Sequence, residues 1–166
     1  MTELSNYKDE IVELISGAPL ERGERWLRRV HLRTESHVGW AHLATHTMPT
    51  VWGGTLDGVR GMLAAGTSPD DPIIRDSLIW LLNQQRGDGG WGSREITYSA
   101  VEATAWVLIT LREAHWSLTD PHVLSAVKYI ESCVTPDGSV ATSIADQAEP
   151  RTYPALLSLW ALHDLS

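Results

Sequence analysis

Three histidines near one tryptophan are the residues whose types and spacing first suggest chemistry. His42 and His46 lie four residues apart, and His37 and Trp40 precede them. On a helix, two histidines at that spacing share one face and could bind a metal ion, with His37 or Asp57 as a third ligand. The segment that holds them has low helix propensity, however, and histidines in such corners often bond backbone carbonyl groups. We therefore predict no metal site and no cofactor.

Two other polar patterns are interpreted as structural. The tripeptide Arg86-Gly87-Asp88 has the sequence of an adhesion motif, but its composition is typical of a tight polar turn. The pair Asp70-Asp71 stands just before Pro72, which is the position of a helix N-cap. Neither pattern is assigned a function.

Composition excludes several classes of protein. The net charge of −8 argues against binding to nucleic acid or to an anionic membrane surface. The chain has no apolar run of about 20 residues, so we expect no membrane span, and no signal peptide is apparent at the start. The single cysteine, Cys133, excludes an internal disulfide. These features predict a soluble cytoplasmic protein with one sizeable core.

A period close to fifty residues runs through the chain. The sequence Asp88-Gly89-Gly90-Trp91 returns in weaker form as Asp137-Gly138-Ser139-Val140, 49 residues later. Thr55, Thr104 and Thr152 each open an apolar run and lie 49 and 48 residues apart. One Gly-rich corner and two apolar runs per unit are typical of a protein built from repeated helix pairs.

The elements that carry this period are all predicted to be helical. Helical periodicity and capping signals place helices at 5–16, 20–32, 51–65, 72–86, 97–114, 121–134 and 151–164, with no strand. The helix at 51–65 keeps four glycines, which lower helix propensity by about 1 kcal/mol each, so it must closely approach another helix or a ligand. We divide the chain into a capping helix at 1–19 and a repeat domain at 20–166.

The stretch from Arg75 to Trp91 resembles the QW motif of the superfamily that includes squalene cyclases, terpene cyclases and protein prenyltransferase β-subunits. The matching residues are Trp80, Leu81, Leu82, Gln85, Gly89 and Trp91. The resemblance extends over about residues 20–164. It implies an all-α fold of the α/α toroid type, in which six outer helices surround six inner helices and an apolar cavity.

This chain supplies about three helical hairpins, which is half of such an α6/α6 barrel. Its third corner is weaker, because Cys133 and Val134 stand where Gln84 and Gln85 stand, and Val140 replaces tryptophan. The half-barrel implies either a piece of a longer protein or closure of the ring by a partner chain or a second copy.

The resemblance also places the segment 97–105 where class II terpene cyclases carry an Asp-x-Asp-Asp motif. Glu102 occupies the position of the middle acid, which protonates the substrate in those enzymes, whereas Ala100 and Ala103 replace the other two acids. Glu102 is therefore the candidate general acid. The alternative is a structural acid that is paired with Arg60, Arg94 or Arg151.

Aromatic residues on the inner helices of that superfamily line the cavity and contact isoprenoid chains. The corresponding cavity residues here are Trp52, Gly54, Asp57, Tyr98, Trp106, Tyr153 and Trp160; the alternative is an ordinary hydrophobic core. The zinc site of the prenyltransferases is not expected, because Glu131 stands where their pattern needs Asp before Cys133. Two functions follow: an isoprenoid-binding, cyclase-like module with at most one remaining acid, or a non-enzymatic scaffold for protein interaction.

Overall fold

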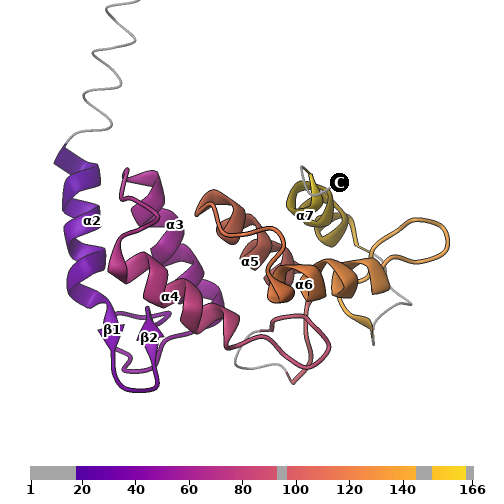
Figure 1. The fold of residues 1–166 in the computed structure, drawn as a ribbon, viewed down its shortest axis with the longest axis horizontal. Helices are drawn as coiled ribbons and strands as arrows, with labels where there is room; N and C mark the ends of the chain where they lie inside the picture. The colour runs from indigo at the N-terminus through magenta and orange to yellow at the C-terminus, as the bar shows by residue number, and fades with distance from the viewer. Residues whose placement is uncertain (1–17, 93–96, 145–150, 164–166) are drawn as a thin grey trace, which may run out of the picture.

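The computed structural model describes residues 18–92, 97–144 and 151–163, and these residues form a succession of helical hairpins (Figure 1). The predicted helix at 5–16, and with it the proposed cap at 1–19 almost entirely, lies outside the described residues. The helices are α2 (Ala18–Val30), α3 (Leu56–Ala64), α4 (Pro72–Leu82), α5 (Val101–Glu113), α6 (Pro121–Ser132) and α7 (Thr152–Leu162). The prediction of an all-α hairpin repeat is confirmed.

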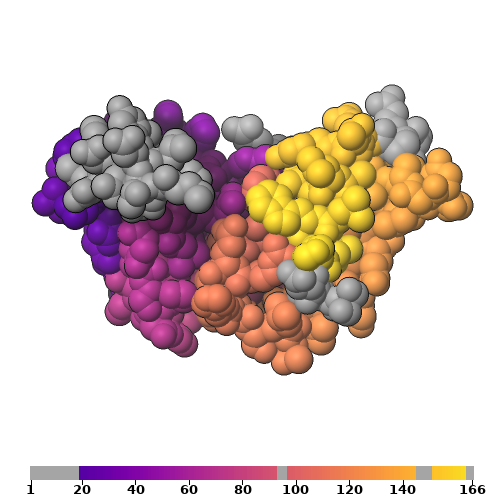
Figure 2. All heavy atoms as spheres, turned by 90° about the horizontal axis from the view of Figure 1, so that it is seen from above, coloured from indigo at the N-terminus to yellow at the C-terminus, as the bar shows by residue number. Residues whose placement is uncertain are grey.

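The helices form an inner and an outer row. The inner helix α5 packs against α3 on one side and α7 on the other. The outer helices pack onto them, with α2 and α4 against α3 and α6 against α5. The pairs therefore succeed one another along the molecule from its indigo end to its orange and yellow end (Figure 2). None of the helices in the described part of the chain is long and apolar enough to cross a bilayer.

The tryptophan of each of the first two corners ties an outer helix to the following inner helix. The indole N–H of Trp91 donates to the carbonyl of Leu81 at 2.7 Å, and its backbone N–H donates to the Thr104 hydroxyl at 2.9 Å. Trp40 repeats both bonds, to the Leu27 carbonyl at 2.8 Å and to the Thr55 hydroxyl at 3.1 Å. Thr55 and Thr104, two of the three threonines that mark the period in the sequence, therefore anchor the first two corners.

The third corner keeps only the backbone part of this arrangement. The carbonyl of Val140 accepts from the N–H of Arg151 at 3.1 Å, just as the Trp91 carbonyl accepts from Ala100 at 2.8 Å. Val140 has no side-chain donor, so this corner lacks the bond that an indole makes to the outer helix.

The outer helices begin at matching Asp-Pro pairs. Asp71 accepts from the N–H of Ile73 at 2.9 Å, and Asp120 accepts from the N–H of His122 at 2.8 Å. Each aspartate satisfies a backbone donor that the first helical turn leaves without a partner, and each is followed by a proline that needs none. Like the corners, the two N-caps are 49 residues apart.

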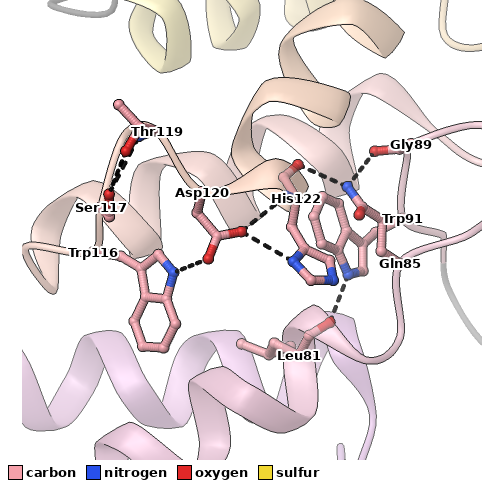
Figure 3. Close-up of polar contacts among 9 residues, drawn as sticks. All are labelled: Leu81, Gln85, Gly89, Trp91, Trp116, Ser117, Thr119, Asp120 and His122. Atoms are coloured by element: carbon pink, nitrogen blue, oxygen red, sulfur yellow. Dashed lines mark hydrogen bonds and ion pairs between the residues drawn. The ribbon is translucent and has the colours of Figure 1, made fainter.

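Side chains from the second corner also reach the next outer helix (Figure 3). The Gln85 amide donates at 2.8 Å to the Gly89 carbonyl in its own corner and at 2.8 Å to the His122 carbonyl at the start of α6. Nearby, the Trp116 indole donates to Asp120 at 3.1 Å. The N-terminus of α6 is therefore held by contacts from two neighbouring segments.

Two sequence predictions were wrong. A continuous helix over 51–65 does not form, because the π-type turn η1 (Val51–Thr55) leaves helical geometry at Trp52 and at Gly53, where φ is +70°. The prediction of no strand fails at a two-residue hairpin of β1 (Leu32–Arg33) and β2 (Val38–Gly39), in which Leu32 pairs with Gly39. Both segments are too short for hydrophobic periodicity to reveal.

The predicted need for close approach in the 51–65 segment is met by Trp40. A Cβ atom on Gly58 would lie 2.3 Å from the Trp40 ring, and one on Gly54 would lie 2.3 Å from the Trp40 carbonyl oxygen. Glycine at these positions lets α3 and the first corner pack without a gap.

Candidate functional site

A cavity of about 230 Å³ lies on the face where the three inner helices meet. Its lining comes from η1, α3, α5 and α7, and it comprises Trp52, Leu56, Asp57, Arg60, Trp106 and Tyr153. The first and last of these residues, Trp52 and Tyr153, are about a hundred positions apart in the sequence, so only the stacking of the hairpins brings them together.

Trp106 is the centre of the side-chain contacts at this cavity. Its ring meets the Trp160 ring edge to face, with centroids 5.4 Å apart, and its indole N–H donates to the Tyr153 hydroxyl at 3.3 Å. The Arg60 guanidinium lies 4.3 Å from the Trp106 ring centroid, which is a cation–π distance. Arg60 also bonds the Glu113 carboxylate at 3.0 Å. These contacts fix the orientation of an otherwise half-exposed indole.

Of the seven predicted cavity residues, four line this cavity, one adjoins it and two lie elsewhere. Trp52, Asp57, Trp106 and Tyr153 line the cavity together, and Trp160 adjoins it through its contact with Trp106. The remaining two do not line it, because Gly54 is buried behind Trp40 and Tyr98 lies exposed near the second corner.

Sequence reasoning missed two lining residues, Leu56 and Arg60. They lie four residues apart on α3, on the helix face that also carries Asp57. Once Asp57 is assigned to the cavity, helical spacing adds Arg60 three residues later, and Leu56 lies four residues before Arg60 on the same face. Arg60 was considered only as a partner for Glu102, whereas it pairs with Glu113.

Glu102 lies in the first turn of α5, one turn before Trp106. Its Oε2 atom is buried and has no hydrogen-bond partner. Burial raises the pKa of the Glu102 carboxyl above its ordinary value, and the opposing positive charge of Arg151 only partly offsets this. Of the three arginines considered as partners, Arg60 is engaged elsewhere, Arg94 lies outside the described residues, and Arg151 acts through its charge.

The two alanines that flank Glu102 provide no further acid. Ala100 and Ala103 are both buried in the core beside it. At the preceding residue, the Val101 N–H donates to the Thr142 carbonyl of the third corner at 2.8 Å. A carboxyl group in these surroundings holds its proton to a higher pH than an exposed one.

The histidines of the first corner do not gather around a common point. Nδ1 of His42 lies 3.1 Å from the Gly53 carbonyl oxygen, which is the backbone contact expected for an imidazole in a corner. Over residues 18–92, 97–144 and 151–163, no group of three or more His, Cys, Asp or Glu side chains could hold a metal ion. Cys133 is buried at the end of α6.

Comparison with known proteins shows partial similarity to cyclases. No family model matches the chain. A probable squalene–hopene cyclase from Sinorhizobium fredii is 33% identical over 96 residues, which cover 51% of this chain and 15% of that protein. A squalene–hopene cyclase from Bradyrhizobium diazoefficiens is 33% identical over 88 residues, or 46% of this chain and 13% of that protein.

A type B diterpene cyclase from Mycobacterium tuberculosis is 37% identical over 65 residues, or 39% of this chain and 12% of that protein. The similar region therefore spans less than a sixth of each relative. These relatives confirm the resemblance to squalene and terpene cyclases that the sequence around Trp91 indicates.

Proposed function

We propose that this chain is a cyclase-like repeat module that binds an apolar, isoprenoid-like chain against the inner helices. The observation that supports the proposal is the aromatic cavity around Trp106, because indole and phenol rings from three successive units converge there. Cavities lined by aromatic side chains with a few polar groups are typical ligand sites. In the proposal, the three hairpins correspond to half of an α/α toroid.

Glu102 is the candidate proton donor within this proposal. It is the acid in the first turn of α5, one turn before the cavity-lining Trp106, and it does not itself line the cavity. A raised carboxyl pKa is what a general acid requires near neutral pH. The absence of acids at Ala100 and Ala103 argues for weak or lost catalysis, so ligand binding rather than turnover is the primary test.

Geraniol, a ten-carbon isoprenoid alcohol, serves as the probe in a titration calorimetry experiment. We expect saturable binding to the chain, and Trp106→Ala should weaken it by about tenfold, which corresponds to about 1.4 kcal/mol of lost apolar contact. Trp52→Ala should weaken binding in the same direction, because Trp52 lines the same cavity.

Trp26→Ala is the matched control, because Trp26 is 45% exposed and Trp52 is 41% exposed, but Trp26 lies outside this cavity. The straight-chain alcohol decanol tests whether binding is selective for the branched isoprenoid. Equal affinity for both alcohols, or loss of binding in Trp26→Ala but not in Trp106→Ala, would contradict the proposal.

A non-enzymatic interaction module is the second candidate function. It is favoured by α7, whose outward side carries Leu156 and Leu159 at 60% and 73% exposure. Large apolar side chains that gather on one exposed face mark interaction surfaces.

A further inference from the structure

A second cavity, of about 170 Å³, lies between helix α2 and the first corner. Trp26, Leu27 and Val30 form its wall on α2, and the opposite wall comes from residues within 40–46 and 53–58. This volume is below the roughly 300 Å³ of a site for a drug-sized ligand. The cavity therefore fits a small molecule.

The first corner packs closely against η1 and α3 because glycines stand at the contacts. A Cβ atom on Gly53 would lie 2.4 Å from Nδ1 of His42, and one on Gly58 would lie 2.3 Å from the Trp40 ring. Nδ1 of His42 also lies 3.1 Å from the Gly53 carbonyl oxygen. Because a carbonyl oxygen only accepts hydrogen bonds, this nitrogen carries the proton, and Nε2 of a neutral His42 ring is left as an acceptor.

The charged and aromatic groups of the lining indicate the class of ligand. Among the described residues that line the cavity, Asp57 is the single carboxylate, and there is no lysine or arginine. Asp57 belongs to none of the salt bridges between described residues. Indole surface comes from Trp26, which is 45% exposed, and from Trp40. An indole and a carboxylate both stabilise a positive charge placed beside them.

The arginines of α2 lie outside this lining. Arg28 bonds both Glu24 and Asp71 at 2.8 Å, so its charge is compensated. The other arginines of α2 are exposed, where salt screens their charges; they are Arg22, Arg25 and Arg29. The net charge of −8 on the whole chain also favours cations over anions.

We propose that this cavity binds the quaternary ammonium group of a small organic cation. A primary ammonium group has three N–H donors that need acceptors, whereas a quaternary group has alkyl groups in their place and needs an apolar surround with one opposite charge. Leu27, Val30 and the two indoles supply that surround, and Asp57 supplies the charge. The site shares only Asp57 with the cavity around Trp106, so it is independent of the proposed isoprenoid site.

Choline and its uncharged counterpart 3,3-dimethylbutan-1-ol test the proposal, because the two molecules have the same shape and differ in charge. Titration calorimetry at about pH 8, where imidazole groups are generally neutral, should show saturable binding of choline. The neutral alcohol should bind at least about tenfold more weakly, and about 1 M salt should weaken choline binding by screening the Asp57 charge. Equal affinity for choline and the alcohol, or tighter binding of ethanolamine, which has a primary ammonium group, would overturn the proposal.

Trp26→Ala and Asp57→Asn should each weaken choline binding by about tenfold, and Trp26→Phe should retain part of it. Asp70→Asn is the control for charge, because Asp70 is an exposed carboxylate outside this cavity. Trp52→Ala is the control for an exposed indole, because Trp52 is 41% exposed and lines the Trp106 cavity instead. Both controls should leave choline binding unchanged. Circular dichroism establishes that each variant is folded before affinities are compared.

The same variants separate this site from the isoprenoid site. Trp26→Ala should weaken choline binding and leave geraniol binding intact, whereas Trp106→Ala should do the reverse. Phosphatidylcholine vesicles distinguish a lipid headgroup from a free cation: vesicle binding that choline competes away assigns the headgroup, and its absence assigns the free cation. No binding of choline, or choline binding that neither Trp26→Ala nor Asp57→Asn weakens, would overturn the proposal, whether or not geraniol binds.

Discussion

Trp91 is the single side chain on which the second hairpin most depends. It is fully buried, and its two nitrogen donors bond the end of α4 and the start of α5. A tryptophan in the same role at position 40 is also buried and bonds the end of α2. The indole is therefore both a large apolar filler and a donor that satisfies the last carbonyl groups of an outer helix.

Trp91→Ala should lower the free energy of unfolding by about 3–5 kcal/mol, because it opens a cavity and removes the bond to the Leu81 carbonyl. Urea denaturation measures the change. Trp26→Ala is the control, since Trp26 is half-exposed and should alter the free energy by less than about 1 kcal/mol. A Trp91 variant that unfolds at the parent's urea concentration would contradict the assigned packing.

Glu102 makes stability depend on pH in a defined direction. Its pKa is raised on folding, so the protonated carboxyl fits the native state better than the carboxylate does. The resulting stability is fully present below the unfolded pKa of 4.5 and is lost as pH rises through the folded pKa. Above that range the native state carries a partly buried negative charge.

Glu102→Gln removes this ionisation and should therefore raise the melting temperature relative to the parent at about pH 8, with the difference disappearing at about pH 4. Thermal melts across that pH range measure it. A Glu102→Gln difference that is constant from about pH 4 to 8 would show that the carboxyl is not desolvated by folding.

At the scale of elements, the repeat is maintained by contacts between the end of one hairpin and the start of the next. The Gln85 amide satisfies two backbone carbonyl groups, one in its own corner and one at the start of α6. The neighbouring Gln84 makes one longer contact, at 3.4 Å, to the Trp80 carbonyl of its own helix. The two adjacent glutamines therefore make different contacts: Gln85 joins two hairpins, whereas Gln84 bonds within its own hairpin.

Gln85→Ala should destabilise the chain by about 1–3 kcal/mol, because it leaves carbonyl groups at a partly buried junction without a partner. Gln84→Ala should change the unfolding free energy by less than about 0.5 kcal/mol. Hydrogen exchange of the first amides of α6 provides a local measurement, and it should accelerate in Gln85→Ala. Equal effects of the two variants would argue that Gln85 does not couple the hairpins.

In the third hairpin, helix α7 forms although the corner before it lacks the tryptophan of the first two corners. Val140 cannot make the indole bond, yet its carbonyl still receives the N–H of Arg151. Helix α7 then packs against α5 through Leu157 and Ala161. Backbone bonding and apolar packing place the helix even without the tryptophan. Thr152 is the first residue of α7, whereas Thr104 is the fourth residue of α5, so the third threonine is not the structural counterpart of Thr104.

At the scale of the whole molecule, the inner row is covered by outer helices on one side and ends in an apolar helix. The concave cavity and the exposed edge of α7 are neighbouring consequences of that arrangement, because Tyr153 and Trp160 face the cavity while Leu156 and Leu159 face away from α5.

The sequence by itself determined the class of fold, a succession of helical hairpins. These hairpins depend on local signals: an Asp-Pro pair that starts an outer helix, a Gly-rich turn that ends it, and apolar spacing within about fifteen residues. The resemblance carried by Gln85 and Trp91 therefore led to the correct class of fold. The kink at Gly53 was beyond it, because Gly53 lies against the His42 ring of the first corner, and local periodicity does not reveal that contact.

Tertiary structure alone decided which side chains share a site. Trp52, Arg60, Trp106 and Tyr153 come together because α3, α5 and α7 stack in order, and the spacing within one helix does not show which side chains of other helices its face will meet. The same stacking places Tyr98 and Gly54 outside the cavity, and it pairs Arg60 with Glu113 rather than with Glu102. The exposure of α7 likewise follows from the number of neighbours it has in space, which its own uniformly apolar sequence cannot specify.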